Sequence, residues 1–516
     1  MNITVRFISA IAALMMCSTL ALAQNNSIFT ATYTTGFIDL DPSTAASSEI
    51  AVLANVYEPL VWWQPGENGS DATLEPGLAT SWEASEDGLS WTFKLREGVT
   101  FHDGTPFTSE AVKFSIERTQ RLEGASAWIW WAVESIETPD PLTAVFKLTD
   151  PSPIPLIASS AYCAWMISPM VGDKTGEWFN AGNVAGTGPF TIRSYKAGVQ
   201  TILERHADYW GESPEGGIDI AVIDNVEDPV LREQRLLGGK SDWSEGLDTD
   251  NLAQIDENEN VRIANFKAFQ NFFGMYNVAK PPLDNIKVRQ ALSYAFPYDQ
   301  MVNNIMSGQV TQARGIVPVG MPGHAADAMQ FTQDIEKAKA LLSDAGVEQD
   351  SLKLTITYTA GSPEPQKAAE IYKAALAQIG VELVLQPMAW EAQYELATSD
   401  PANAQDIFMM FWWPTYVTSL DFLSSLFRSE DDINYNLSYY KNADFDALVD
   451  KGADTMATDS ASSVQAFEEA SRLLAADAPA VFIYDQQNAY GVREDIKGYI
   501  SNPAYSHVVF LNQISR

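Results

Sequence analysis

Apolar and polar side chains alternate with period two along residues 82–95, which predicts two strands, each with one apolar face. An acidic-Gly turn at residues 86–88 interrupts the alternation and predicts that the two strands form a hairpin. A second turn at residues 103–106 is followed by Thr108, whose side chain is suited to cap a helix N-terminus. We therefore expect a hairpin and then a helix within residues 75–118.

Strand patterns and helical patterns continue to alternate downstream. Strands are expected at residues 200–205, 272–277, 352–358, 381–385, 406–411 and 481–484, and helices at residues 227–237, 286–296, 335–345 and 366–379. The order strand, helix, strand in the second half is expected of a parallel sheet, so the fold class is α/β. The 516 residues exceed the ~250–300 at which a single core stops growing, which favours two lobes.

The first 23 residues have the pattern of a secretory signal. Arg6 is their only charge, and it is followed by an apolar run and a small-residue cleavage site. We therefore expect residues 1–23 to be removed as a signal peptide and the mature protein to be soluble and periplasmic. Cys17 has the spacing of a lipoprotein cysteine, so a lipid anchor stays open, although two methionines precede it where small residues are required.

The charge and cysteine content exclude several classes of partner. The chain carries 32 Lys and Arg against 67 Asp and Glu, and such a surface repels nucleic acids and anionic lipids. After cleavage Cys163 would be the remaining cysteine, so we expect a buried thiol and no disulfide. The four histidines, at positions 102, 206, 324 and 507, are far apart along the chain and form no ligand pair, so no metal or other cofactor is expected.

Five motifs occur in the order of a known family. They are NVYEPL at 55–60, EPGLATSWEASEDGLSWTFKLREGVTFHDGTPFTSEAVKFSIER at 75–118, GTGPF at 186–190, ERHADYW at 204–210 and VRQALS at 288–293. The ordered set resembles the extracytoplasmic solute-binding proteins of the peptide/nickel class, which feed ABC importers. The resemblance covers nearly the whole mature chain.

The resemblance implies a two-lobe periplasmic-binding-protein fold with a small extra domain inserted in the first lobe. The first lobe would comprise residues 24–65, 187–275 and 487–516, the inserted domain residues 66–186, and the second lobe residues 276–486. A ligand between the lobes would favour a closed form that the ABC permease in the inner membrane recognises. We expect a monomer that captures a peptide or peptide-like solute and catalyses no reaction.

The candidate ligand site is the aromatic segment 411–422, which follows a predicted strand. Ligands of open α/β sheets bind beyond the carboxyl ends of strands, and aromatic side chains line such pockets. The main candidates are Trp412, Trp413, Thr415, Tyr416 and Asp421. The secondary candidates are Thr34, Asp242, Trp243 and Trp390. The alternative role of these side chains is core packing or, for the aspartates, the ordering of a turn.

The chain departs from the dipeptide binders that it resembles. Those proteins hold the ligand carboxylate with an Arg in the loop that corresponds to residues 359–365, which contain no Arg. They hold the ligand amine with an Asp early in the loop that corresponds to residues 415–419, which contain no Asp. An oligopeptide, an oligosaccharide or another polar organic solute therefore stays open as the ligand.

Two other function classes also stay open. A sensory or chaperone-like binding protein could use the same fold, because a fold alone does not determine function. An enzyme could use Asp421 and Asp242 as acid and base in glycoside cleavage. This alternative is less favoured, because carboxylate pairs arise by chance among 67 acidic residues.

Overall fold

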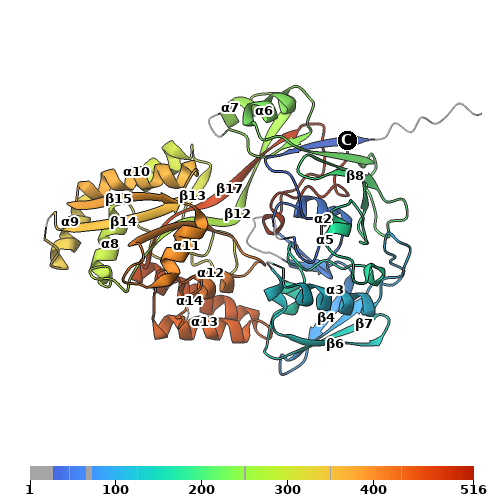
Figure 1. Cartoon of the computed structure of the whole chain (residues 1–516), viewed down its shortest axis with the longest axis horizontal. Coiled ribbons are helices and arrows are strands. Elements are labelled where there is room, and N and C mark those ends of the chain that lie inside the picture. Colours follow the sequence, from blue (N-terminus) through green and yellow to red (C-terminus); the bar gives the residue numbers. More distant parts are fainter. Residues whose placement is uncertain are drawn as a thin grey trace, which may run out of the picture.

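The computed structural model describes residues 27–45, 47–65, 73–124, 126–248, 251–348, 350–431 and 433–516. The predicted signal peptide and Cys17 lie outside these residues. Two lobes lie side by side and share one large sheet, whose strand order is β15-β14-β16-β12-β17-β11-β1-β10-β9-β8 (Figure 1). The predicted two-lobe α/β fold is thereby confirmed. In the part of the chain that the structure describes, no helix combines the length and apolarity needed to cross a membrane.

The second lobe, on the left in Figure 1, contains the predicted parallel strands. Its strands are β13 (Val310–Gln312), β14 (Leu352–Thr359), β15 (Val381–Met388) and β16 (Ile407–Trp412), and β14 pairs in parallel with both β15 and β16. Its helices are α8 (Ile286–Ala295), η4 (Gln300–Ile305), α9 (Ile335–Asp344), α10 (Pro363–Ala377), α11 (Trp390–Ser399), α12 (Ser419–Phe427), α13 (Ala443–Thr455) and α14 (Ser460–Asp477). The apolar faces of α8 and α10 pack with the strands around Leu292, Ile356 and Tyr372.

The first lobe is built around β1 (Ile28–Tyr33), which runs parallel to both of its neighbours. Its other strands are β8 (Phe190–Lys196), β9 (Gln200–Arg205), β10 (Ile220–Asn225) and β11 (Trp243–Ser244). Its helices are α2 (Ile50–Val56), α5 (Gly176–Phe179), α6 (Pro229–Leu237) and α7 (Leu252–Asp256). The C-terminal segment returns to this lobe and includes the short helix η5 (Pro503–Tyr505).

A separate four-stranded antiparallel sheet lies below the first lobe in Figure 1, and we call the described residues from 73 to 171, which contain this sheet and its helix, the inserted part. It contains β4 (Ala79–Ala84), β5 (Ser90–Leu95), β6 (Val133–Asp140), β7 (Thr143–Leu148) and α3 (Ser109–Leu122). The hairpin and helix predicted within residues 75–118 are confirmed. The shorter elements nearby are β2 (Val61–Gln64), β3 (Thr73–Pro76), η1 (Ala127–Trp130), α4 (Ile154–Ile157) and η2 (Pro169–Val171).

Two long antiparallel strands, β12 (Val261–Tyr276) and β17 (Ala480–Arg493), connect the lobes. The short strands predicted at 272–277 and 481–484 are correct in type but far too short. Both strands continue through polar residues, because pairing with the partner strand supplies the backbone hydrogen bonds there. A pattern of alternating apolar and polar residues does not identify such a stretch as a strand. The register shifts between Lys267 and Asn271, where the chain passes between the lobes. Since the lobes share one sheet, the domain boundaries stay a prediction.

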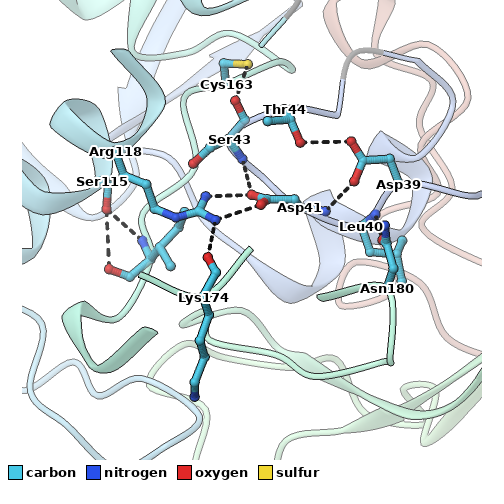
Figure 2. A network of polar contacts seen from close by, with 11 residues as sticks. Asp39, Leu40, Asp41, Ser43, Thr44, Ser115, Arg118, Cys163, Lys174 and Asn180 are labelled. Atoms are coloured by element: carbon cyan, nitrogen blue, oxygen red, sulfur yellow. Dashed lines mark hydrogen bonds and ion pairs between the residues drawn. The ribbon is translucent and has the colours of Figure 1, made fainter. Parts of the chain in front are cut away.

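Polar contacts tie the inserted part to the first lobe. Arg118 on α3 pairs with Asp41 in the loop after β1 and donates to the carbonyl oxygen of Lys174 (Figure 2). The thiol of Cys163 donates to the carbonyl oxygen of Ser43 in the same network. Cys163 is buried and free, as predicted.

Candidate functional site

A cavity of about 300 Å³ lies between the lobes. Segments from the first lobe, the inserted part, β12 and the loop after β16 all contribute to its wall. The lining residues are Thr34, Thr35, Ser47, Ser48, Ser159, Ser160, Ala161, Tyr162, Glu245, Phe269, Gln270, Trp413, Pro414, Thr415, Tyr416, Val417, Pro503, Ala504, Ser506 and His507. The wall therefore combines aromatic faces with several hydroxyl groups, a composition that suits a small polar solute.

The loop between β16 and α12 forms one side of the cavity. The side chain of Trp413 is 55% exposed, whereas that of Tyr416 is buried and its ring lies 6.3 Å from the ring of Trp128. The hydroxyl of Thr418 accepts a hydrogen bond from the backbone N–H of Leu420 and so caps α12. Of the five main candidates, the structure places Trp413, Thr415 and Tyr416 in the wall of the cavity.

Asp421 stabilises the conformation of this loop and does not itself line the cavity. It lies in the first turn of α12, is 5% exposed and accepts a hydrogen bond of 2.9 Å from the backbone N–H of Thr415. Burial raises the pKa of Asp421 to about 6, against the lowering effect of that hydrogen bond. The structure thus favours the loop-ordering role over direct contact with a ligand.

Two of the predicted tryptophans pack outside the cavity in the second lobe. The ring of Trp412 lies 5.0 Å from that of Tyr435. Trp390 begins α11 and packs against Phe408, with ring centroids 5.8 Å apart. Both rings have these partners within the second lobe, and neither side chain is among those that line the cavity.

Asp242 and Trp243 are also absent from the residues that line the cavity, and both contact other parts of the first lobe. Trp243 is fully buried on β11 between the rings of Tyr33 and Tyr490, at 4.9 and 4.7 Å. Asp242 accepts a hydrogen bond from the backbone N–H of Thr30 and forms an ion pair with Arg516. Neither Asp242 nor Asp421 is among the residues that line the cavity.

Thr34 does line the cavity, and it contacts a pair of titratable side chains, Glu245 and His507, that sequence reasoning missed. Its backbone N–H and its hydroxyl both donate to one oxygen of Glu245, at 3.0 and 2.9 Å. The other oxygen of Glu245 lies 2.7 Å from Nδ1 of His507. The two residues are 262 positions apart, and no local pattern connects them.

Each member of this pair stabilises the charged form of the other. Burial alone would raise the pKa of Glu245, but the hydrogen bonds from His507 and Thr34 outweigh burial and lower it. Burial alone would lower the pKa of His507, but the hydrogen bond and negative charge of Glu245 outweigh burial and raise it. The pair therefore places a histidine, whose protonated form Glu245 favours, beside a carboxylate in the wall of the cavity.

Hydrogen bonds also connect the inserted part to the loop after β16. The hydroxyl of Ser160 donates to the carbonyl oxygen of Thr415 at 2.8 Å. The phenol of Tyr505 donates to the carbonyl oxygen of Ser159 at 2.6 Å, which joins the same segment to the C-terminal region. The cavity wall is thus held together by side chains from distant parts of the chain.

The histidines are not all as isolated as their sequence positions indicate. The rings of His102 and His206 contact each other with centroids 4.9 Å apart. Among the described residues, no group of three or more His, Cys, Asp and Glu side chains is arranged to hold a metal ion.

Comparisons with known proteins agree with this architecture. The sequence model of the family described as "Bacterial extracellular solute-binding proteins, family 5 Middle" matches residues 73–434. The chain is 29% identical over 483 residues to the probable D,D-dipeptide-binding periplasmic protein DdpA of Escherichia coli K12, covering 92% of each chain. It is 28% identical over 463 residues to the dipeptide-binding protein of the same organism, covering 84% of each chain.

A solved structure shows the same fold. HbpA2 from Haemophilus parasuis superimposes with a TM-score of 0.84 over 95% of this chain and 99% of that chain, at 23% sequence identity. The family match spans more than half of the chain, and the predicted motifs of the peptide/nickel class fall on the scaffold of this two-lobe fold. The chain therefore belongs to the bacterial extracellular solute-binding proteins of family 5, the class that its sequence motifs predicted.

Proposed function

We propose that this protein captures a short peptide or peptide-like solute in the cavity between its lobes and delivers it to the permease of an ABC importer. The observation that carries the proposal is the composition of the cavity wall, to which both lobes and the inserted part contribute. A ligand there contacts parts that move relative to one another on hinge closure. Its binding energy therefore favours the closed form.

Two further observations support a peptide over a larger ligand. A volume of about 300 Å³ is at the lower end of the range for small-molecule sites, which suits a di- or tripeptide. Two of the relatives are named for dipeptides. We assign ligand contacts to Thr34, Trp413, Thr415 and Tyr416, whose ring faces and hydroxyls would stack on and hydrogen-bond to the solute.

The proposal includes a location and a mode of action. The relative DdpA is named as a periplasmic protein, so we place the mature protein in the periplasm, and we further propose that it is a monomer. It would bind its solute and release it unchanged to the inner-membrane permease.

Binding assays on the purified mature protein test this function. Thermal-shift and calorimetric titrations against di- and tripeptides, oligosaccharides and other polar solutes should identify stoichiometric binding by peptides, since a ligand of the native state raises its stability. The solute should be recovered unchanged after incubation. Binding by a sugar without binding by any peptide, or conversion of the solute, would contradict the proposal.

A further inference from the structure

We propose that His507 anchors a carboxylate group of the ligand through Nε2–H, while the buried carboxylate of Glu245 holds Nδ1 on the opposite side of the ring. This inference rests on the proposed function, because it names the chemistry by which the cavity between the lobes selects its solute. It predicts that an acidic group on the ligand is required and that a free α-amine is dispensable.

The hydrogen bonds of Glu245 determine which ring nitrogen is offered to a ligand. Its two oxygens are occupied by Thr34, which donates twice, and by Nδ1 of His507. Glu245 is 5% exposed, whereas 43% of the His507 side chain is exposed and lines the cavity. With Nδ1 directed at Glu245, Nε2 is the nitrogen left for the solute.

The backbone of His507 is fixed from two sides, so the ring is held in place before a ligand arrives. Its N–H donates to the phenol of Tyr490 at 3.1 Å, and its carbonyl oxygen accepts from the phenol of Tyr33 at 2.7 Å. The residue has a φ of 71°, a left-handed conformation that the two hydrogen bonds maintain. A preorganised donor loses little entropy on binding.

The charges around the ring favour a bound anion. Among the described residues that line the cavity, no Lys or Arg occurs, and His507 is the side chain that can carry positive charge. Glu245 raises the pKa of His507, and burial keeps the facing phenols of Tyr33 and Tyr490 neutral by raising their pKa values. With a net charge of −35 on the protein, an anionic solute needs such a local cation.

The same residues explain why a ligand amine would lack a charged partner. Glu245 is the carboxylate among the described lining residues, and both of its oxygens are already engaged. Asp421 is buried behind the loop after β16 and accepts from Thr415. The amine of a peptide would therefore remain solvated or meet hydroxyl groups.

Matched peptides test the inference on the wild-type protein without any substitution. Di- and tripeptides are titrated by calorimetry as the free peptide, the N-acetyl acid and the C-terminal amide. The free peptide and the N-acetyl acid should bind alike, and the amide should bind at least about tenfold more weakly, because it lacks the charge-assisted hydrogen bond. Equal binding of acid and amide would overturn the inference while leaving the proposed function intact.

The pH profile and a variant add independent readouts. Affinity for the acid should fall as pH rises through the raised pKa of His507 and its ring loses the proton, because the ligand carboxylate stays ionised at neutral and higher pH. His507→Gln should abolish both the pH dependence and the preference for the acid. His324→Gln, a histidine outside the cavity, should change neither.

The remaining outcomes are equally decisive. If His507→Gln fails to fold, the acid-to-amide ratio and the wild-type pH profile still decide the question. If His507→Gln folds and keeps the preference for the acid, the inference is wrong. If no peptide binds in any form, the proposed function fails and the inference fails with it.

Discussion

Both carboxylate oxygens of Asp41 accept hydrogen bonds from the guanidinium of Arg118, at 2.6 and 2.7 Å, and both side chains are 1% exposed (Figure 2). The pair joins the inserted part to the first lobe across 77 positions of sequence. Removal of Arg118 leaves a buried carboxylate without its partner. Arg118→Ala should therefore lower the free energy of unfolding by about 3–5 kcal/mol, measured by urea denaturation.

An exposed ion pair provides the control for Arg118. Arg428 and Asp450 pair at 2.7 Å, but their side chains are 43% and 50% exposed. Arg428→Ala should lower the free energy of unfolding by less than about 1 kcal/mol, since water can hydrate the exposed carboxylate of Asp450 in place of the guanidinium. Similar losses of unfolding free energy in the two variants would show that the burial of the Arg118–Asp41 pair does not increase its contribution to stability.

Trp413 should contribute to ligand affinity without contributing to folding. Its side chain is 55% exposed and lines the cavity, so its ring has room to stack on a bound solute. Trp413→Ala should weaken binding of the best peptide about tenfold and leave the urea midpoint nearly unchanged. Trp131, which is 61% exposed and lies outside this cavity, is the matched control, and Trp131→Ala should bind normally. Unchanged affinity in the Trp413 variant would remove this residue from the site.

Ser160 and Ser159 form a natural matched pair in the cavity wall. The hydroxyl of Ser160 donates to the carbonyl oxygen of Thr415 in the loop after β16, whereas that of Ser159 donates to the carbonyl oxygen of Leu156 within its own turn. Ser160→Ala removes the link between the inserted part and the loop after β16. We expect ligand affinity to fall about fivefold, which corresponds to about 1 kcal/mol for one hydrogen bond. Ser159→Ala should retain wild-type affinity in the same titration, and an equal loss in both variants would contradict a specific role for the link.

Asp485 on β17 should make the protein less stable as pH rises. It is 3% exposed, and one oxygen accepts from the backbone N–H of Val319 while the other has no partner among the described residues. Burial raises its pKa to about 7, against the attraction of Lys267. A group whose pKa is raised by folding contributes its full stability below its unfolded pKa, and that stability is lost as pH rises through the folded value.

Asp485→Asn tests this sign directly. The Asn side chain cannot ionise. The free energy of unfolding of the variant should therefore equal that of the wild type at about pH 4 and exceed it above about pH 7, by on the order of 2–4 kcal/mol. Urea unfolding of both proteins across this range measures the difference. Asp344→Asn, at an exposed side chain, should stay within about 0.5 kcal/mol of the wild type. A constant difference between Asp485→Asn and the wild type over the whole range would refute the raised pKa.

The sequence pattern predicted the helices and strands well, because neighbouring residues largely determine where such an element forms. The turn at residues 86–88 and the alternation around it determine the hairpin of β4 and β5, since each strand's apolar face is set by neighbouring residues. The same holds for the parallel strands β14 and β15, whose boundaries differ from the predicted ones by a few residues. The order of these elements was sufficient to predict the fold class.

The ligand site depended on contacts that no segment contains. Trp243 and Trp413 are the same residue type, yet one is enclosed by Tyr33 and Tyr490 and the other is 55% exposed. Burial of a tryptophan depends on which distant side chains surround it. Glu245 and His507 likewise become a hydrogen-bonded pair only when the residue after β11 and the C-terminal segment meet. Periodicity records the environment along one element, whereas the cavity and its charge arise where elements far apart in the chain pack together.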